Sequence, residues 1–198
     1  MPSITLPVQS VTNGMPGLIR RASAILVAPK AEWVRIEAEN ATIRDIHRSY
    51  VLVLAAIGPA ATFIAMQVPG ANNRPTLASA AAWALFGYLL ALAAVHLLAL
   101  AANALAPRFG GRRDGAAAFR LAAYSSTAAW LARIFLIVPS PWAAVAGLLV
   151  SLYSFYLLHL GVPRMMHVPE ARAGAFTATL VVIMLFVNLA AFLILRAL

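Results

Sequence analysis

The sequence predicts an all-α, polytopic membrane protein with five transmembrane helices and N-terminal amphipathic, interfacial helices. Three observations lead to this fold class. Hydrophobic residues make up 63% of the 198 residues, whereas charged residues make up only 11%. The apolar residues gather into five stretches, each near the ~20 residues that a helix needs to cross a bilayer. The basic residues lie almost wholly in every second connection between these stretches.

The order of the expected segments follows from this pattern. Residues 1–16 are expected to form a flexible N-terminal tail, residues 17–49 cytoplasmic amphipathic helices, and residues 50–198 a five-helix membrane domain. The five spans run roughly from Tyr50 to Val68, Leu77 to Leu105, Phe119 to Val138, Trp142 to Leu160 and Phe176 to Leu195.

The first helix ahead of the membrane is expected to begin near Leu18, because proline and glycine break up the preceding tail. Apolar residues then recur at helical spacing up to Leu26. On this interpretation Arg20 and Arg21 lie elsewhere on the helical wheel. The result is a short amphipathic helix.

Pro29 suits the first turn of a second helix. Trp33 and Ile36 share one of its faces, and its charged residues Glu32, Arg35 and Glu39 are expected to remain solvated. We expect Trp33 to be an interfacial anchor at the level of the lipid headgroups, with both helices lying on the inner leaflet. Docking of a soluble partner is the alternative.

A third element is expected to begin at Thr42, where the hydroxyl and Asp45 form a capping arrangement. It leads into the first span through His47, which we expect to face solvent or headgroups. Gly58-Pro59 lies near the centre of that span and predicts a kink, because proline removes a backbone donor and clashes with the preceding turn. Both simple packing and a hinge fit this dipeptide.

The charge distribution predicts the orientation. Twelve basic residues lie before the first span, between the second and third, and between the fourth and fifth, whereas Arg74 and Arg196 lie on the opposite side. By the positive-inside rule, the amino terminus is cytoplasmic and the carboxyl terminus external. An odd number of crossings agrees with this orientation.

A few polar residues within the spans are functional candidates, because polar groups in the hydrocarbon are costly. Arg133 is the foremost. Asn188 has nearly the same expected depth and could accept a hydrogen bond from the guanidinium, so we expect these two helices to touch. His96 completes a possible intramembrane polar network, although a buried interhelical hydrogen bond is its simplest role.

Several classes of function are disfavoured by the sequence. The chain has no cysteine, and all six acidic residues fall outside the spans, so neither a catalytic triad nor a carboxylate proton relay is supported. His96, His159 and His167 differ too much in depth to share one metal ion. We therefore expect no enzymatic activity, no catalytic or cofactor-binding residues and no metal. The net charge of +9 is explained by topology and by anionic lipid headgroups rather than by nucleic acid.

Three segments resemble bacterial Yip1-domain proteins: APKAEWVRIEAE from Ala28, AYSSTAAWLARIFLIVP from Ala122 and YSFYLLHLGVPRMMHVPE from Tyr153. The resemblance covers most of the chain from about residue 20. The positions that carry its motifs are Tyr124, Ser125, Tyr156, Leu157, Gly161 and Pro163. The proline that usually follows the tyrosine-serine element is displaced here, the nearest being Pro139. The resemblance implies five spans, a cytoplasmic amino terminus and an external carboxyl terminus.

The function expected from these observations is that of a non-enzymatic membrane protein of the Yip1 type in the bacterial inner membrane, which organises membrane or binds partner proteins. Its expected partners are the lipid bilayer, anionic headgroups and either another protein or a second copy of the chain. The alternative is a small transporter or channel with a polar path near Arg133, His96 and Asn188.

Overall fold

The structure, a computed structural model, describes residues 14–39, 41–67 and 75–197. Within these ranges every regular element is helical, which confirms the predicted all-α class. The predicted tail at 1–16 lies almost wholly outside the described residues, as does the connection at 68–74. The elements are α1 (Met15–Val27), α2 (Pro29–Ala38), α3 (Ile43–Ile46), the π-helix η1 (His47–Val51), α4 (Leu52–Ala55), α5 (Ile57–Gln67), α6 (Leu77–Leu105), the 3-10 helix η2 (Ala106–Phe109), α7 (Gly115–Ser125), α8 (Thr127–Ala132), the 3-10 helix η3 (Arg133–Ile137), α9 (Pro141–Met166) and α10 (Glu170–Ala197).

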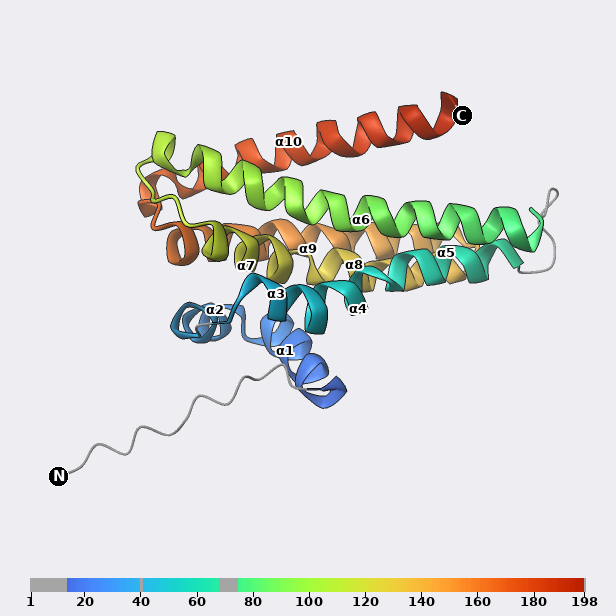
Figure 1. Cartoon of the computed structure of the whole chain (residues 1–198), viewed down its shortest axis with the longest axis horizontal. Coiled ribbons are helices and arrows are strands. Elements are labelled where there is room, and N and C mark those ends of the chain that lie inside the picture. Colours follow the sequence, from blue (N-terminus) through green and yellow to red (C-terminus); the bar gives the residue numbers. More distant parts are fainter. Residues whose placement is uncertain (1–13, 40, 68–74, 198) are drawn as a thin grey trace.

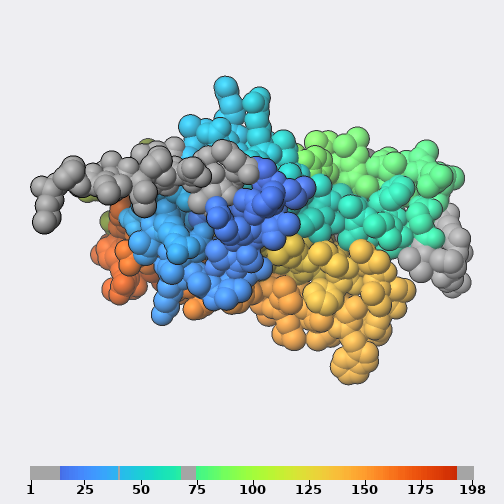
Figure 2. Space-filling view, turned by 90° about the horizontal axis from the view of Figure 1, so that it is seen from below, coloured from blue at the N-terminus to red at the C-terminus, as the bar shows by residue number. Residues whose placement is uncertain are grey.

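The long helices form an elongated bundle (Figure 1). Helices α7 and α8 follow one another along α9, while α6 packs between α5, α7 and α10. Helix α10 also contacts α9 and η2 near its start, then diverges from α6 towards its C-terminal end. The shorter helices α1 and α2 lie against one side of the bundle, where they cover part of its surface (Figure 2).

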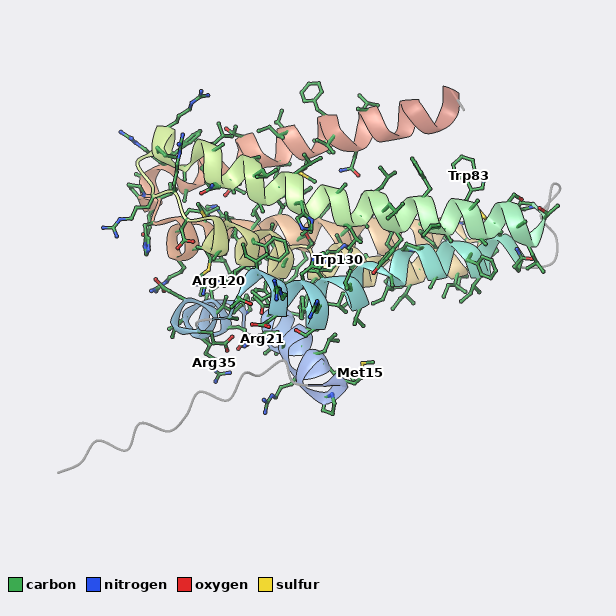
Figure 3. All side chains as sticks on the ribbon, in the orientation of Figure 1. Met15, Arg21, Arg35, Trp83, Arg120 and Trp130 are labelled. Carbon is green, nitrogen blue, oxygen red and sulfur yellow. The ribbon has the colours of Figure 1, made fainter. Side chains whose placement is uncertain are left out.

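Within the residues that the structure describes, four helical runs are long and apolar enough to cross a membrane, and each overlaps a predicted span. They are Ile43–Gln67, Leu77–Phe109, Pro141–Met166 and Glu170–Ala190. Many large apolar side chains on these helices point outwards, including Trp83 of α6 (Figure 3) and Leu148 of α9. An apolar surface of this extent is typical of helices that face lipid rather than water.

The remaining predicted span, at 119–138, is not one continuous helix. The chain there is divided into α7, α8 and η3, with a turn at Ser126. Three consecutive hydroxyl side chains explain the break, because Ser125 and Ser126 donate to the carbonyl of Ala122 and Thr127 donates to that of Tyr124. Such bonds from serine and threonine to preceding carbonyls bend helices.

The break also leaves a backbone donor to be satisfied. The amide of Ala129 donates to Ser154 Oγ of α9 at 2.8 Å. A neighbouring helix therefore replaces the intrahelical partner, as an apolar environment requires. The discontinuity is consequently fixed by packing against α9 along the whole of α7 and α8.

The helical run that contains the first predicted span begins earlier than that span, at Ile43. Thr42 accepts a hydrogen bond from the Asp45 amide at 3.2 Å, so the predicted cap is present. A turn at Ala56 separates α4 from α5, three residues before Pro59. The predicted interruption near Gly58-Pro59 is therefore observed, one turn ahead of the proline, where the ring would otherwise clash with the helix.

The α6–α7 and α9–α10 connections meet at one end of the bundle (Figure 1). The Arg112 amide donates to the Met166 carbonyl at 2.9 Å. Gly111 makes this approach possible, because a Cβ atom there would lie 2.5 Å from the same carbonyl oxygen. His167 turns the chain in a left-handed conformation, φ 51°. Arginines from both connections therefore share one end of the molecule.

Candidate functional site: an ion-pair cluster beneath the N-terminal helices

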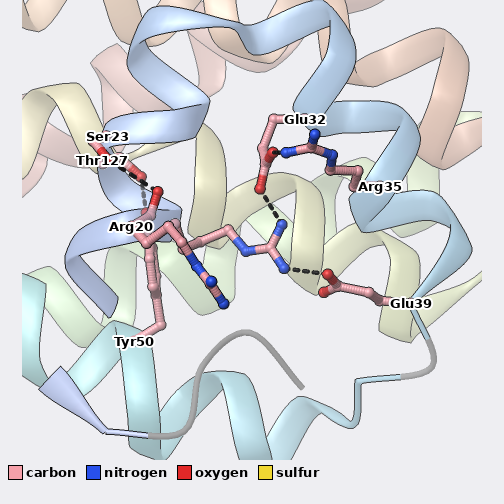
Figure 4. Close-up of polar contacts among 8 residues, drawn as sticks. Arg20, Ser23, Glu32, Arg35, Glu39, Tyr50 and Thr127 are labelled. Atoms are coloured by element: carbon pink, nitrogen blue, oxygen red, sulfur yellow. Dashed lines mark hydrogen bonds and ion pairs between the residues drawn. The ribbon is translucent and has the colours of Figure 1, made fainter. Parts of the chain in front are cut away.

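Helices α1 and α2 follow one another in the chain and contact each other. We call this pair the N-terminal hairpin, and its inner face contains buried charges. Arg21 of α1 donates a hydrogen bond from Nη1 to the Glu32 carboxylate and one from Nη2 to the Glu39 carboxylate. Figure 4 draws both bonds as dashed lines that end on the labelled Glu32 and Glu39. Arg21 is fully buried and Glu32 is only 3% exposed. Arg35 also donates to Glu32, at 3.2 Å, from the solvent side. Burial of charged groups of this kind requires pairing, because unpaired charges are strongly disfavoured away from water.

The position of Arg21 follows from helix geometry. Leu18, Ala22 and Ile25 are buried on α1, and Arg21 occupies the same i, i+3, i+4, i+7 stripe. The expectation that Arg21 lies off the apolar face is therefore wrong. So is the expectation of a solvated Glu32, because α2 packs its Glu32, Trp33 and Ile36 side chains inwards.

The charges in the cluster reinforce the protonated state of Arg21. Burial alone would lower the pKa of Arg21, but the hydrogen bond to Glu39 and the negative potential of Tyr124, Glu39 and Glu32 outweigh it and raise that pKa. Arg21 also lies over the ring of Tyr124, with 5.6 Å between the guanidinium carbon and the ring centroid. The hairpin is thus joined to α7 by a cation–π contact.

Arg120 of α7 makes a second connection to the hairpin. Its guanidinium donates to the backbone carbonyls of Glu39 and Ile36, at the C-terminal end of α2 (Figure 3). Those carbonyls lack partners within the helix and carry the negative end of its dipole, so a cation is favourable there. Tyr153 of α9 does the same for α1, where its hydroxyl donates to the Leu26 carbonyl at 2.9 Å.

Trp33 is buried in protein, at 1% exposure, rather than facing headgroups. Its Nε1 donates to the Leu157 carbonyl of α9 at 3.1 Å. The indole lies over Gly161, where a Cβ atom would come within 2.6 Å of Trp33 Cζ2. Trp33 also meets the Tyr124 ring edge-on, with 6.4 Å between centroids. A glycine at 161 is what permits this insertion.

Three of the six sequence-predicted family positions contact this tryptophan. Tyr124 and Leu157 are fully buried. The Tyr124 ring, the Leu157 carbonyl and the backbone at Gly161 each contact Trp33. Ser125 is buried next to Tyr124 on α7. Tyr156 is 44% exposed and contacts the Tyr153 ring, and Pro163 lies within α9. The quoted motifs therefore converge on the contact between the hairpin and the bundle.

Tyr50 extends the cluster into the bundle, a role that no sequence pattern indicated. Its hydroxyl and that of Thr127 are 2.7 Å apart, and its ring lies 4.8 Å from that of Tyr124. The Tyr124 hydroxyl has no hydrogen-bond partner within the described ranges. Two tyrosines, one from the π-helix and one from α7, thus connect the ion pairs to the break before α8.

The proposed intramembrane polar network is not assembled. Asn188 is exposed and donates to the Met184 carbonyl of its own helix at 2.7 Å, instead of pairing with Arg133. The Arg133 side chain packs against Gly58 of α5, with 3.1 Å between its Cγ and the position of an added Cβ. His96 Nδ1 bonds to the Leu92 carbonyl at 2.7 Å, and its ring faces His47. Nothing in these contacts supports the transporter alternative.

A bundle of long helices with apolar outer surfaces, joined at one end by arginine-rich connections, defines an integral membrane protein with several crossings. Within that class the chain belongs to the Yip1-domain family, since the sequence model of the Yip1 domain matches residues 23–192. The predicted resemblance is thereby confirmed.

Two similar proteins are the inner membrane protein YohC of Escherichia coli strain K12 and its counterpart in E. coli O6:H1. Each is 27% identical to this chain over 158 residues, which covers 76% of this chain and 81% of the relative. No solved structure matches the chain.

Proposed function

We propose that this Yip1-domain protein is a non-enzymatic organiser of the bacterial inner membrane, in which the N-terminal hairpin binds anionic headgroups on the cytoplasmic side. The relatives named as inner membrane proteins support the location. The proposal includes five crossings, with α7, α8 and η3 together as the third. It also includes a cytoplasmic amino terminus, supported by the twelve-to-two distribution of basic residues.

The observation that carries the proposal is the contrast between the two faces of the hairpin. The inner face is fixed to α7 and α9 by ion pairs and by Trp33, as described above. The outer face exposes Met15, Ile19, Val27 and Val34, with Val27 84% exposed. Exposed basic residues accompany these apolar side chains: Arg20, Lys30 and Arg35. Apolar and basic residues on one face are typical of helices that lie in the headgroup region of an anionic membrane.

The energetics favour a lipid surface as the binding partner of the hairpin's outer face. Each basic residue near an anionic surface contributes about 1 kcal/mol. An exposed valine or isoleucine gains roughly 1.5–3 kcal/mol when it is fully buried in an apolar phase. A rigidly docked hairpin pays little additional entropy on binding, because its helices are already ordered by the bundle.

The lipid contact is tested with a fluorophore attached at Val27→Cys, since the chain contains no cysteine that would compete for the label. In vesicles with 30% anionic lipid, we expect the probe to be quenched by lipids brominated near the headgroup. The Arg20→Gln/Lys30→Gln variant should lose most of that quenching. A label at Glu37→Cys, on the α2 face towards Arg164, serves as the control.

Two results would overturn the lipid assignment. One is a Val27 probe that stays in water in every vesicle. The other is a probe that becomes shielded equally in neutral vesicles and detergent at high protein concentration, which would indicate a second copy of the chain or another protein. The topology is tested separately by fusing a reporter to Leu198 that is active only in the periplasm; activity is expected.

A further inference from the structure

The π-helix η1 brings His47 against His96 of α6. This pair was not predicted from the sequence. The two imidazole centroids are 5.2 Å apart, with 65° between the ring planes. Phe119 of α7 lies beside both rings, 6.2 Å from His47 and 5.2 Å from His96. π-helical segments occur frequently at functional sites, because the extra residue re-aims the side chains.

We propose that His47 and His96 form a binding site for one divalent transition-metal ion, such as Zn²⁺ or Cu²⁺. Imidazole nitrogens are preferred ligands of these ions. Two imidazoles bound to one tetrahedral ion, with metal–nitrogen bonds of about 2.1 Å, place their ring centroids about 5 Å apart. The observed spacing matches that geometry.

The nitrogen atoms of the two rings differ in their hydrogen bonding, and both cases support a role as metal ligands. The bond between His96 Nδ1 and the Leu92 carbonyl, 2.7 Å, requires a proton on Nδ1 and so leaves the Nε2 lone pair free. Metal-binding histidines commonly donate their second nitrogen to a backbone carbonyl in this way. The Nδ1 atom of His47 is buried and has no hydrogen-bond partner among the described residues. A metal ion would satisfy this nitrogen, which otherwise incurs a desolvation cost.

The protein supplies two ligands in this site. The described parts of the chain contain no group of three or more histidine, cysteine or acidic residues that could hold an ion. Water or a phosphate oxygen would therefore have to complete the coordination. Because η1 belongs to the first span and His96 to the second, a bound ion would connect these two helices directly.

The experiment uses the full chain in detergent, purified with a tag that contains no histidine and titrated with Zn²⁺. We expect saturable binding of one ion per chain. His47→Gln and His96→Gln should each raise the dissociation constant for Zn²⁺ at least tenfold. His159→Gln, whose ring lies near Thr177 of α10, should change it by less than twofold. Wild-type protein that binds no stoichiometric ion, or equal affinity in all variants, would overturn the proposal.

A second measurement covers the case in which a variant does not fold. The wild-type protein is treated with a histidine-modifying reagent, with and without Zn²⁺, and the four histidines are quantified by mass spectrometry. Zn²⁺ should reduce modification of His47 and His96 together, at least fivefold, and leave His159 and His167 within twofold. Uniform protection, or protection of only one of the pair, contradicts a shared ion.

Discussion

The buried ion pair between Arg21 and Glu32 permits a quantitative test of how the hairpin is held. Replacing Glu32 by methionine leaves a buried, charged Arg21 with Glu39 as its remaining carboxylate partner. Loss of one member of a buried ion pair typically costs about 3–5 kcal/mol. We expect a value near the lower end, about 3 kcal/mol, because the bond to Glu39 persists.

The double variant Arg21→Met/Glu32→Met removes both charges and keeps similar side-chain volumes. The double variant should lose less free energy of unfolding than Glu32→Met alone. No unpaired charge stays buried in it, and Glu39 can still reach solvent. The loss of free energy of unfolding in Arg21→Met should lie between those of the double variant and Glu32→Met, since Glu32 retains its bond from Arg35. The sum of the two single-variant costs minus the cost of the double variant gives the coupling free energy. We expect it to be at least about 3 kcal/mol, because the double variant should cost less than either single variant.

The free energy of unfolding is measured in detergent by denaturant titration, followed through tryptophan fluorescence, to which Trp33 contributes from within the cluster. Glu37→Met is the matched control on the same helix, because Glu37 is partly exposed and its nearest cation, Arg164, is 3.8 Å away. It should change stability by less than about 0.5 kcal/mol. Strictly additive costs for Arg21→Met and Glu32→Met would refute the reasoning.

Three further variants test the packing described above, each measured as thermal unfolding in detergent. Gly161→Ala should destabilise by about 1–3 kcal/mol, since its Cβ would meet Trp33 at 2.6 Å, whereas Gly87→Ala, with open space around it, should be neutral or slightly stabilising; equal effects would contradict this. Gly111→Ala should lower stability by a similar amount through the Met166 carbonyl, and no loss would show that the connections separate freely. Tyr50→Phe should cost about 1 kcal/mol by removing the bond to Thr127, and an unchanged stability would contradict a contribution from that bond.

Four of the five predicted spans overlap long apolar helices within the described residues, because length and hydrophobicity are enough to recognise a helix of this kind. The break in the third stretch was not predicted, because hydrophobicity does not record the bonds that Ser125, Ser126 and Thr127 make to preceding carbonyls. The run of three hydroxyl residues was the available signal.

The site was less predictable than the fold, for two physical reasons. Depth along a helix does not fix the direction in which a side chain points, so the similar depths of Arg133 and Asn188 did not make them neighbours. The prediction for the hairpin was wrong for a different reason. The helical spacing of Leu18, Arg21, Ala22 and Ile25 already placed the arginine on the apolar stripe of α1. Its charge suggested an exposed position, although Glu32 and Glu39 were available to compensate for burial.

Four hydrogen bonds between the hairpin and the bundle run from three side chains to main-chain oxygens: Trp33 to Leu157, Arg120 to Ile36 and Glu39, and Tyr153 to Leu26. Every residue has a carbonyl, so the acceptor side of each bond survives almost any exchange that preserves the local helix. The donors have no such freedom. Random mutagenesis of this interface should therefore yield a lopsided result, with intolerance concentrated at Trp33, Arg120 and Tyr153.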